Sequence, residues 1–196
     1  LDLRRVFLNG VEKFDKAPQK QADVNKTLAM DLVLCIDLSR RMKSALDYIK
    51  DNTRSAHDRL SERFKKKYHY SELCLRVRII GFRDKFSDGE SSFECSEFFN
   101  LPDEEAALLS FLDSLEAAGG GDTSESGLEA LILATRSPWC DSPEPFVRTR
   151  HVIMFFSDSA VLSSEKAGAY PESMSSSLKE LLARWDEEMD PVTQRL

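Results

Sequence analysis

The sequence has little of what marks several common classes of protein. Its 196 residues include four cysteines and three histidines, all widely spaced, and no CxxC pair. This scatter argues against a Cys/His zinc site and against a disulfide framework, so a reducing compartment, the cytoplasm, is expected. No signal peptide is recognisable, and no apolar run approaches the roughly 20 residues that a membrane helix needs. We therefore expect no membrane partner.

The sequence also has fewer positively charged than negatively charged residues. The chain has 27 lysines and arginines against 34 acidic residues, a formal net charge of −7. Nucleic acids and anionic lipids are bound by basic surfaces, so neither is an expected partner. A local basic cluster at residues 63–67 ends a predicted helix, where cations complement the helix dipole. Cys35 and Cys74 lie in apolar, strand-like runs and are predicted to be buried free thiols.

Glycine is scarce too, yet three of the eight glycines are consecutive, at residues 119–121. They are followed by Asp122-Thr123-Ser124-Glu125 and then by apolar residues at helical spacing. Such a turn lets the backbone approach a ligand closely and places side-chain oxygens at the start of a helix. Two further polar clusters, 37–39 and 157–159, end apolar runs. Three polar loops beside buried elements suggest one shared site.

The apolar pattern predicts an α/β fold. Short, almost wholly apolar runs at 30–36 and 151–156 are typical of strands buried on both faces. The other expected elements are one long helix at 42–64, a strand at 73–82, a weak edge strand at 93–99, and helices beginning at Pro102, after the glycine-rich loop and at 178. Residues 1–28 are expected to be an extension, and 29–196 the domain. This order favours a Rossmann-like, three-layer arrangement: a mainly parallel sheet with one antiparallel edge strand and helices on both faces. Ligands of such sheets bind at the carboxyl ends of the strands.

The motifs together resemble a von Willebrand factor A domain. The resemblance is carried by Asp37-Leu38-Ser39-Arg40-Arg41, by the glycine-rich loop at 119–125 and by Asp158. Residues 42–52, residues 80–84 and the pair Pro138-Trp139 also resemble intracellular bacterial and protist members of the family, including those attached to alpha-type kinases. The similarity covers about residues 30–190.

What the resemblance implies is a protein-binding module with a metal-ion-dependent adhesion site. Its oxygen ligands would hold Mg²⁺, or alternatively Mn²⁺ or Ca²⁺, and an open coordination position would accept a carboxylate from the partner protein. The implied metal ligands are Asp37, Ser39, Asp122, Thr123 and Asp158. Residues expected beside the site, where they would contact the partner, are Arg83, Asp84, Glu125 and Ser159.

Two features depart from the family pattern. Arg41 stands where the family has a serine that contacts the cation, and a guanidinium cannot be a ligand. Either Arg41 turns away and leaves a weakened cation site, or it pairs with Asp37 or Asp158 and takes the place of the cation. Converging carboxylates without any positive charge would be costly in a partly buried site. The second departure is at the end of the chain: the family has a further strand and helix, and residues 192–196 are expected to begin that strand.

Several of these residues have a purely structural alternative. Asp122 and Glu125 have the spacing of a capping box, and Ser39 is suited to cap the helix that follows it. Arg83 and Asp84 are suited to a local ion pair. Trp139 is expected to be a packing residue.

Three functions stay open, and a non-enzymatic binding protein is preferred. The first is the Mg²⁺-dependent binding module, and the second is a metal-free assembly scaffold. The third is a Mg²⁺-dependent phosphoryl-transfer hydrolase with Asp37 as nucleophile. That chemistry generally needs an acid two residues later, where Ser39 stands, and a lysine, for which Lys166 is the nearby candidate. The motifs contain no nucleophile–base pair, and the glycine-rich loop lacks the Gly-Lys-Ser/Thr ending of a phosphate-binding loop.

Overall fold

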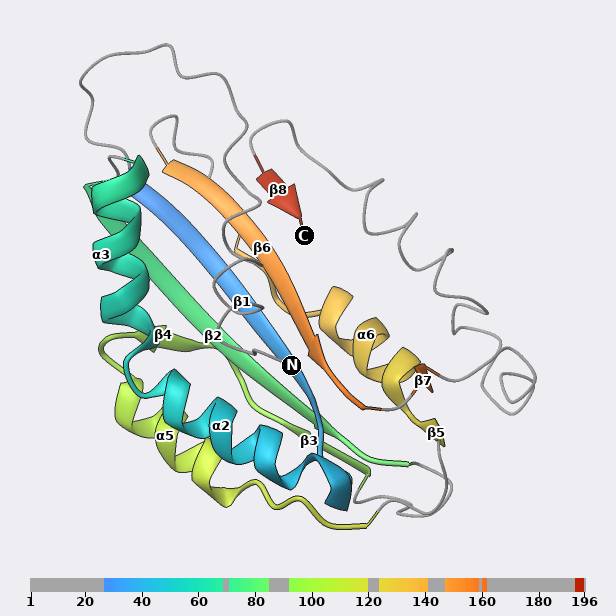
Figure 1. Cartoon of the computed structure of the whole chain (residues 1–196). Helices are drawn as coiled ribbons and strands as arrows, with labels where there is room; N and C mark the ends of the chain where they lie inside the picture. Colours follow the sequence, from blue (N-terminus) through green and yellow to red (C-terminus); the bar gives the residue numbers. More distant parts are fainter. Residues whose placement is uncertain are drawn as a thin grey trace.

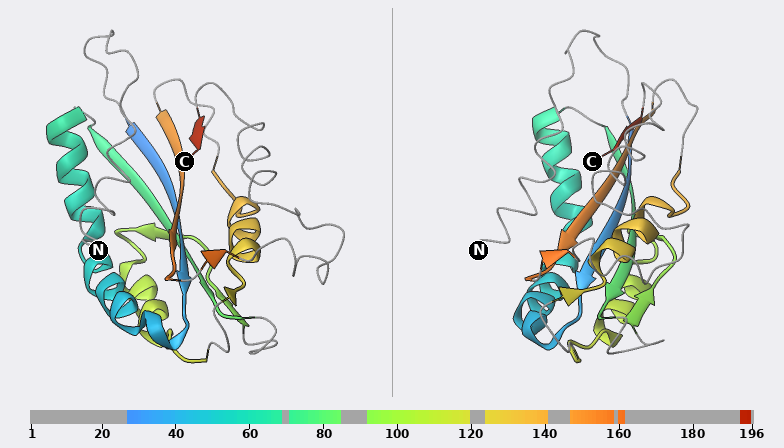
Figure 2. Two further views of the ribbon diagram at one scale, coloured as in Figure 1. Left: turned by 45° about the vertical axis from the view of Figure 1, so that its right-hand side comes forward. Right: turned by 90° about the vertical axis from the view of Figure 1, so that its right-hand side faces the viewer.

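The computed structural model describes residues 27–68, 71–84, 92–119, 124–140, 147–158, 160–161 and 193–195. These residues form a mainly parallel sheet with helices on both faces (Figures 1 and 2), which confirms the expected α/β, Rossmann-like class. Most of the predicted N-terminal extension, Lys166 and the predicted helix from residue 178 lie outside the described residues. Among the helices that are described, none is long and apolar enough to span a bilayer.

The central strand of the sheet is β1 (Thr27–Asp37). It runs parallel to β2 (Glu72–Phe82) on one side and to β6 (Val147–Phe156) on the other. The strand order is β3-β2-β1-β6-β8, and β8 (Thr193–Arg195) is parallel to β6. A strand was expected near residues 192–196, and β8 confirms it. Because helices cover both faces, β1 is buried along nearly its whole length.

The weak strand predicted at 93–99 is indeed at the sheet edge, but it is interrupted. β3 (Phe93–Cys95) and β4 (Phe99–Leu101) both pair antiparallel with β2. Between them, the Ser96 hydroxyl accepts a hydrogen bond from the Ile79 amide (2.9 Å), and the Ser96 amide donates to the Ile79 carbonyl (3.0 Å). A serine side chain thus replaces one partner of the backbone ladder, and the strand breaks there.

Two separate cores flank the sheet. On one face, the even-numbered residues of β1 pack against α2 (Lys43–Thr53), α3 (Ala56–Tyr68) and α5 (Glu105–Ser114). On the other face, Val33 and Cys35 pack with Ala130 and Ala134 of α6 (Gly127–Thr135). The two faces are visible in Figure 2, with α3 and α6 on opposite sides of the strands. The alternation along β1 therefore builds a three-layer structure.

The long helix predicted at 42–64 is divided. A 3₁₀ turn, η1 (Arg40–Met42), leads into α2, and a turn at Arg54 and Ser55 separates α2 from α3. The Thr53 hydroxyl donates to the Ile49 carbonyl (2.8 Å), an arrangement that loosens the end of a helix. The predicted apolar stripe is nevertheless buried throughout: Met42, Leu46, Ile49, Thr53, Ala56, Leu60 and Phe64.

The helix predicted after the glycine-rich loop is α6, which lies very close to the sheet. A Cβ atom at Gly127 would be 2.8 Å from the ring of Phe155 in β6, so glycine is required for this approach. The short strands β5 (Ser124–Glu125) and β7 (Ala160–Val161) form a second, parallel pair near the start of α6 (Figure 1).

One burial prediction is half wrong. Cys35 is buried as expected, but Cys74 is exposed. Near its beginning, β2 alternates between buried and exposed side chains, and Cys74 falls on the exposed set. The face of β2 that carries Cys74 is covered only toward the end of the strand, so an apolar run at its beginning does not bury every residue.

Candidate functional site

The candidate site lies at the carboxyl ends of three adjacent strands. Asp37 is the last residue of β1, Arg83 and Asp84 directly follow β2, and Ser157 and Asp158 directly follow β6. The parallel register brings these ends together, since Asp37 is aligned with Phe82, and Ile36 with Phe156. Two of the three predicted polar loops therefore meet at one edge, which we call the carboxyl edge. The third, at 120–123, lies with Asp122 and Thr123 outside the described residues, as does Ser159.

Asp37 is fully buried, and both of its carboxylate oxygens have partners. Oδ1 accepts a hydrogen bond from the Ser39 amide (2.8 Å), and Oδ2 accepts one from the Ser157 hydroxyl (2.7 Å). Asp37 therefore ties the loop after β1 to the loop after β6. Ser157 belongs to a cluster that the sequence singled out, but its role as a partner of Asp37 was not predicted.

Ser39 occupies the N-cap position of η1 but does not cap it. Its side chain makes no capping hydrogen bond, and its hydroxyl oxygen is buried without a hydrogen-bond partner among the described residues. The structural alternative, in which Ser39 serves as a helix cap, is therefore wrong. An unsatisfied buried hydroxyl costs free energy, on the order of 1–3 kcal/mol. Such a group is more typical of a binding site than of a helix cap.

Arg41 pairs with Asp158. Its Nε atom is 3.2 Å from Oδ2 of Asp158, and the two side chains are 49% and 41% exposed. Of the two arrangements considered for Arg41, the structure has the paired one. A guanidinium thus stands next to Asp158, one of the three aspartates implied as metal ligands.

These residues do not fit a divalent cation as they stand. Asp158 is in contact with a permanent positive charge, and Asp37 already accepts two hydrogen bonds. The described residues contain no group of three or more His, Cys, Asp or Glu side chains suited to a metal ion. Among the described residues of this edge, the Ser39 hydroxyl is buried and has no hydrogen-bond partner.

The glycine-rich loop is anchored on both sides. Before it, the Ala118 amide donates to the Leu38 carbonyl (2.9 Å), and Gly119 has a φ of 73°, which favours glycine. After it, α6 begins at Gly127 with Ser126 as N-cap residue. The capping box of Asp122 and Glu125 is therefore wrong, because Glu125 lies in β5, before the N-cap.

The residue that occupies the third position of α6 is Glu129, which the sequence reasoning missed. It is 2% exposed, and neither carboxylate oxygen has a hydrogen-bond partner among the described residues. Ser126 and Glu129 have the spacing of a capping box. The Ser126 amide donates instead to the Arg83 carbonyl (3.4 Å). The helix dipole favours a carboxylate at this end of α6.

Arg83 points inward and is not placed to contact a partner. It is 8% exposed, and Nη2 lies 2.7 Å from the Glu116 carbonyl and 2.7 Å from Oε1 of Glu94. Asp84 is also buried, at 3%. The proximity of both residues to the carboxyl edge agrees with the sequence, but their burial is opposite to the expected role.

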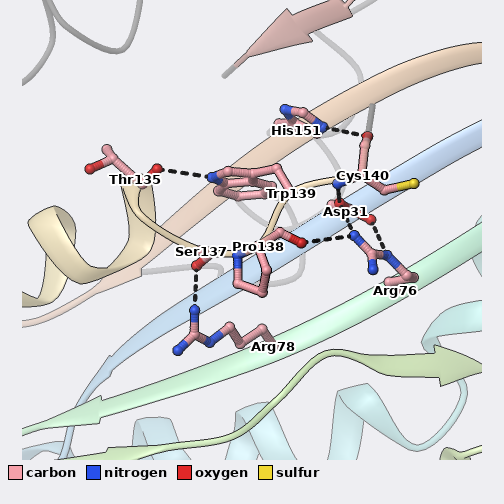
Figure 3. A network of polar contacts seen from close by, with 9 residues as sticks. All are labelled: Asp31, Arg76, Arg78, Thr135, Ser137, Pro138, Trp139, Cys140 and His151. Carbon is pink, nitrogen blue, oxygen red and sulfur yellow. Dashed lines mark hydrogen bonds and ion pairs between the residues drawn. The ribbon is translucent and has the colours of Figure 1, made fainter. Parts of the chain in front are cut away.

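A second polar cluster lies farther back along the sheet (Figure 3). Asp31, six residues before Asp37 on β1, accepts two hydrogen bonds from Arg76 (2.7 and 2.5 Å) and one from the Cys140 amide (2.7 Å). Trp139 stacks on the buried His151, with ring centroids 4.8 Å apart, which confirms it as a packing residue. This cluster fastens the segment after α6 to β1, β2 and β6, and its residues are structural.

Comparison with known proteins gives a likeness of fold alone. No family model and no curated protein matches the chain. Two crystal structures of the pilus adhesin SpaC from Lactobacillus rhamnosus GG are similar, with TM-scores of 0.44 and 0.42 and sequence identities of 15% and 18%. Each comparison covers 68% of this chain but only 16% and 15% of the adhesin. A likeness this distant carries no argument about what the chain binds.

At the carboxyl edge, the half-exposed Arg41 guanidinium pairs with Asp158, and the buried Asp37 joins the loops after β1 and β6. An oriented arginine can bind a carboxylate through two parallel hydrogen bonds.

Proposed function

We propose that this chain is a protein-interaction module that binds its partner at the carboxyl edge, with Arg41 in the place that a divalent cation would take in a von Willebrand factor A domain. The observation that carries the proposal is the ion pair between Arg41 and Asp158, 3.2 Å long and half exposed. It puts a fixed positive charge at the edge where ligands of parallel sheets bind.

The partner group that fits this edge best is a carboxylate. Arginine has five N–H donors in a planar fork, which matches the two oxygens of a carboxylate. Asp158 restrains the guanidinium, so less conformational entropy is lost when a partner is bound. On this proposal, recognition of an acidic side chain on the partner needs no Mg²⁺.

The burial of Asp37 argues against the hydrolase alternative. A nucleophilic carboxylate must reach the substrate, whereas Asp37 has no exposed surface and both its oxygens accept hydrogen bonds. The same two bonds give Asp37 a different role, which is to hold the loops that carry Arg41 and Asp158.

The first test is calorimetric titration of the chelator-stripped protein and of its Arg41→Ser variant with Mg²⁺ and Mn²⁺. We expect no saturable binding by the natural chain, because the guanidinium neutralises Asp158. Saturable binding by the natural chain would refute the substitution of the cation by Arg41. Saturable binding by the Arg41→Ser variant but not by the natural chain would support this substitution most directly.

The second test measures partner capture by immobilised wild-type, Arg41→Glu and Arg54→Glu proteins from extracts of the source cells. Arg54 is a matched control, because its pair with Asp113 has a similar length (3.1 Å) and similar exposure (49% and 53%). We expect a partner held equally by wild type and Arg54→Glu, in chelator or in Mg²⁺, and about tenfold or more weakened by Arg41→Glu. Equal capture by all three proteins, or capture that requires Mg²⁺, would contradict the proposal.

A further inference from the structure

A single residue touches both flanks of the glycine-rich loop. Arg83 follows β2 directly, and its guanidinium Nη2 donates to the carbonyl of Glu116, which precedes the loop, at 2.7 Å. Its own carbonyl accepts a hydrogen bond from the amide of Ser126, which follows the loop, at 3.4 Å. Arg83 thus joins two points that are ten residues apart in the sequence but adjacent at the carboxyl edge.

Arg83 is itself firmly fixed. Its amide donates to the Ser92 carbonyl (2.8 Å), and its guanidinium forms an ion pair with Glu94 of β3 (2.7 Å). The Arg83 side chain is 10% exposed and that of Glu94 is 35% exposed. A charge-assisted hydrogen bond in such a setting is stronger and more directional than one between neutral groups.

Besides the bond from Arg83, the segment before the loop is held by two other hydrogen bonds. The Lys50 ammonium donates to the Leu115 carbonyl (2.8 Å), and the Ala118 amide donates to the Leu38 carbonyl (2.9 Å). Leu38 lies between Asp37 and Ser39, so this flank is connected directly to the loop that carries Arg41. Of these three hydrogen-bonding partners, Arg83 alone also has a hydrogen bond to the segment after the loop.

We propose that Arg83 is a positioning residue: it sets the spacing of the described segments before and after the glycine-rich loop, at Glu116 and Ser126, without contacting the partner. This inference rests on the proposed function for the importance of the edge, but not for the geometry of Arg83. It replaces the sequence-based expectation that Arg83 meets the partner. Arginine suits this role because its planar group can bond a carbonyl and a carboxylate at once.

The test is amide hydrogen exchange, followed by mass spectrometry, on wild type, Arg83→Met, Arg83→Lys and the control Arg78→Met. Arg78 is a matched control because it lies on β2, the strand that Arg83 directly follows, and makes two comparable contacts, to the Ser96 carbonyl and the Ser137 hydroxyl (2.9 Å each), away from the loop. We expect exchange in Arg83→Met to be about tenfold faster in peptides spanning 115–119, which the guanidinium holds, and less affected in 124–127, where the Arg83 carbonyl remains as acceptor, with the central strands unchanged. Arg83→Lys should recover part of this protection, because its ammonium keeps the charge and three donors.

Uniformly faster exchange throughout Arg83→Met, matching Arg78→Met, would overturn the inference and leave Arg83 as an ordinary stabilising residue. Unchanged exchange at both flanks would overturn it as well. If Arg83→Met does not fold, Glu94→Gln decides, because it weakens the ion pair that holds the guanidinium while leaving the Arg83 backbone contacts in place; peptides spanning 115–119 should then exchange faster. The capture experiment with Arg41→Glu is separate, so failure of the proposed function is distinguishable from failure of this inference.

Discussion

The ion pair between Asp31 and Arg76 should be among the most costly contacts to break in this protein. Asp31 is 4% exposed at its side chain and Arg76 is 27% exposed, and two hydrogen bonds join them. The pKa of Arg76 is raised, chiefly by its hydrogen bond to Asp31. The perturbation is a double-mutant cycle of Asp31→Ala, Arg76→Ala and the combination.

The two single variants should differ, because the groups they leave behind differ in exposure. Arg76→Ala leaves a buried carboxylate with the Cys140 amide as its one remaining partner among the bonds described, which should cost about 3–5 kcal/mol of unfolding free energy. Asp31→Ala leaves an arginine that can reach water and still lies over Phe98 (4.5 Å), so about 1–3 kcal/mol is expected. The double variant should be more stable than the sum of the two effects by about 1–3 kcal/mol.

Urea unfolding at neutral pH, followed by circular dichroism, measures these free energies. The exposed pair of Arg54 and Asp113 is the control, and removing either partner should change stability by less than about 1 kcal/mol. The reasoning is refuted if Arg76→Ala costs no more than Asp113→Ala, or if the effects of Asp31→Ala and Arg76→Ala are simply additive.

Two further predictions concern the backbone of the loop and the buried thiol. Gly119→Ala should lower the unfolding free energy by about 1–2 kcal/mol, since φ is 73°, whereas Gly119→Asn should cost less; equal costs in urea unfolding would contradict this. Burial raises the pKa of the Cys35 thiol far above its ordinary value, so the folded protein should react with a thiol reagent at the three exposed cysteines, and at Cys35 only after unfolding. Because the pKa of Cys35 is raised in the folded state only, the protonated thiol stabilises the folded protein by a constant amount below the ordinary thiol pKa, and this stabilisation is lost as pH rises above it. In urea unfolding at alkaline pH, a Cys35→Ala variant that loses stability as fast as wild type would argue against this.

Much of the fold was predictable because burial leaves a direct mark on the sequence. β1 and β6 each contain a nearly unbroken apolar run, at residues 32–36 and 152–156, and strands covered on both faces have such runs. The stripe of apolar residues from Met42 to Phe64 likewise predicted one continuous buried face. Elements whose pattern reflects what covers them could therefore be placed with few errors.

The errors occur where a single side-chain hydrogen bond or a short strand pairing decides the structure. Thr53 and Ser96 bond to neighbouring backbone groups and interrupt a helix and a strand, although the hydrophobic pattern continues through both positions. Ser126 occupies the N-cap position of α6 that was predicted for Asp122, because the two residues before it, Ser124 and Glu125, form the short strand β5. The Thr53 bond is local, but the contact of Ser96 with Ile79 and the pairing of β5 with β7 join positions that are distant in the sequence, which a single sequence does not reveal.

The candidate site was predictable in location but not in its contacts. Topology alone brings Asp37 and Asp158 to one edge, and Arg41 could be identified as a departure from the family pattern. Whether Arg41 would turn away or pair with an aspartate depended on geometry. Ser157 and Glu129 left only weak signals in the sequence. Ser157 is a hydroxyl residue beside Asp158, and Glu129 stands three residues after Ser126.

The position of β1 between two parallel neighbours has a consequence for how the chain folds as it is made. Its partner β2 follows within a few dozen residues, but its contact with the end of β6 joins residues 120 positions apart in the sequence. Parallel sheets with such distant pairings form slowly, because the entropy of closing the loop is lost before the contacts form. During synthesis, β1 must wait with one apolar edge open, a state prone to association with other chains. The same topology that brings Asp37 and Asp158 together therefore makes early folding of this protein dependent on protection of its central strand.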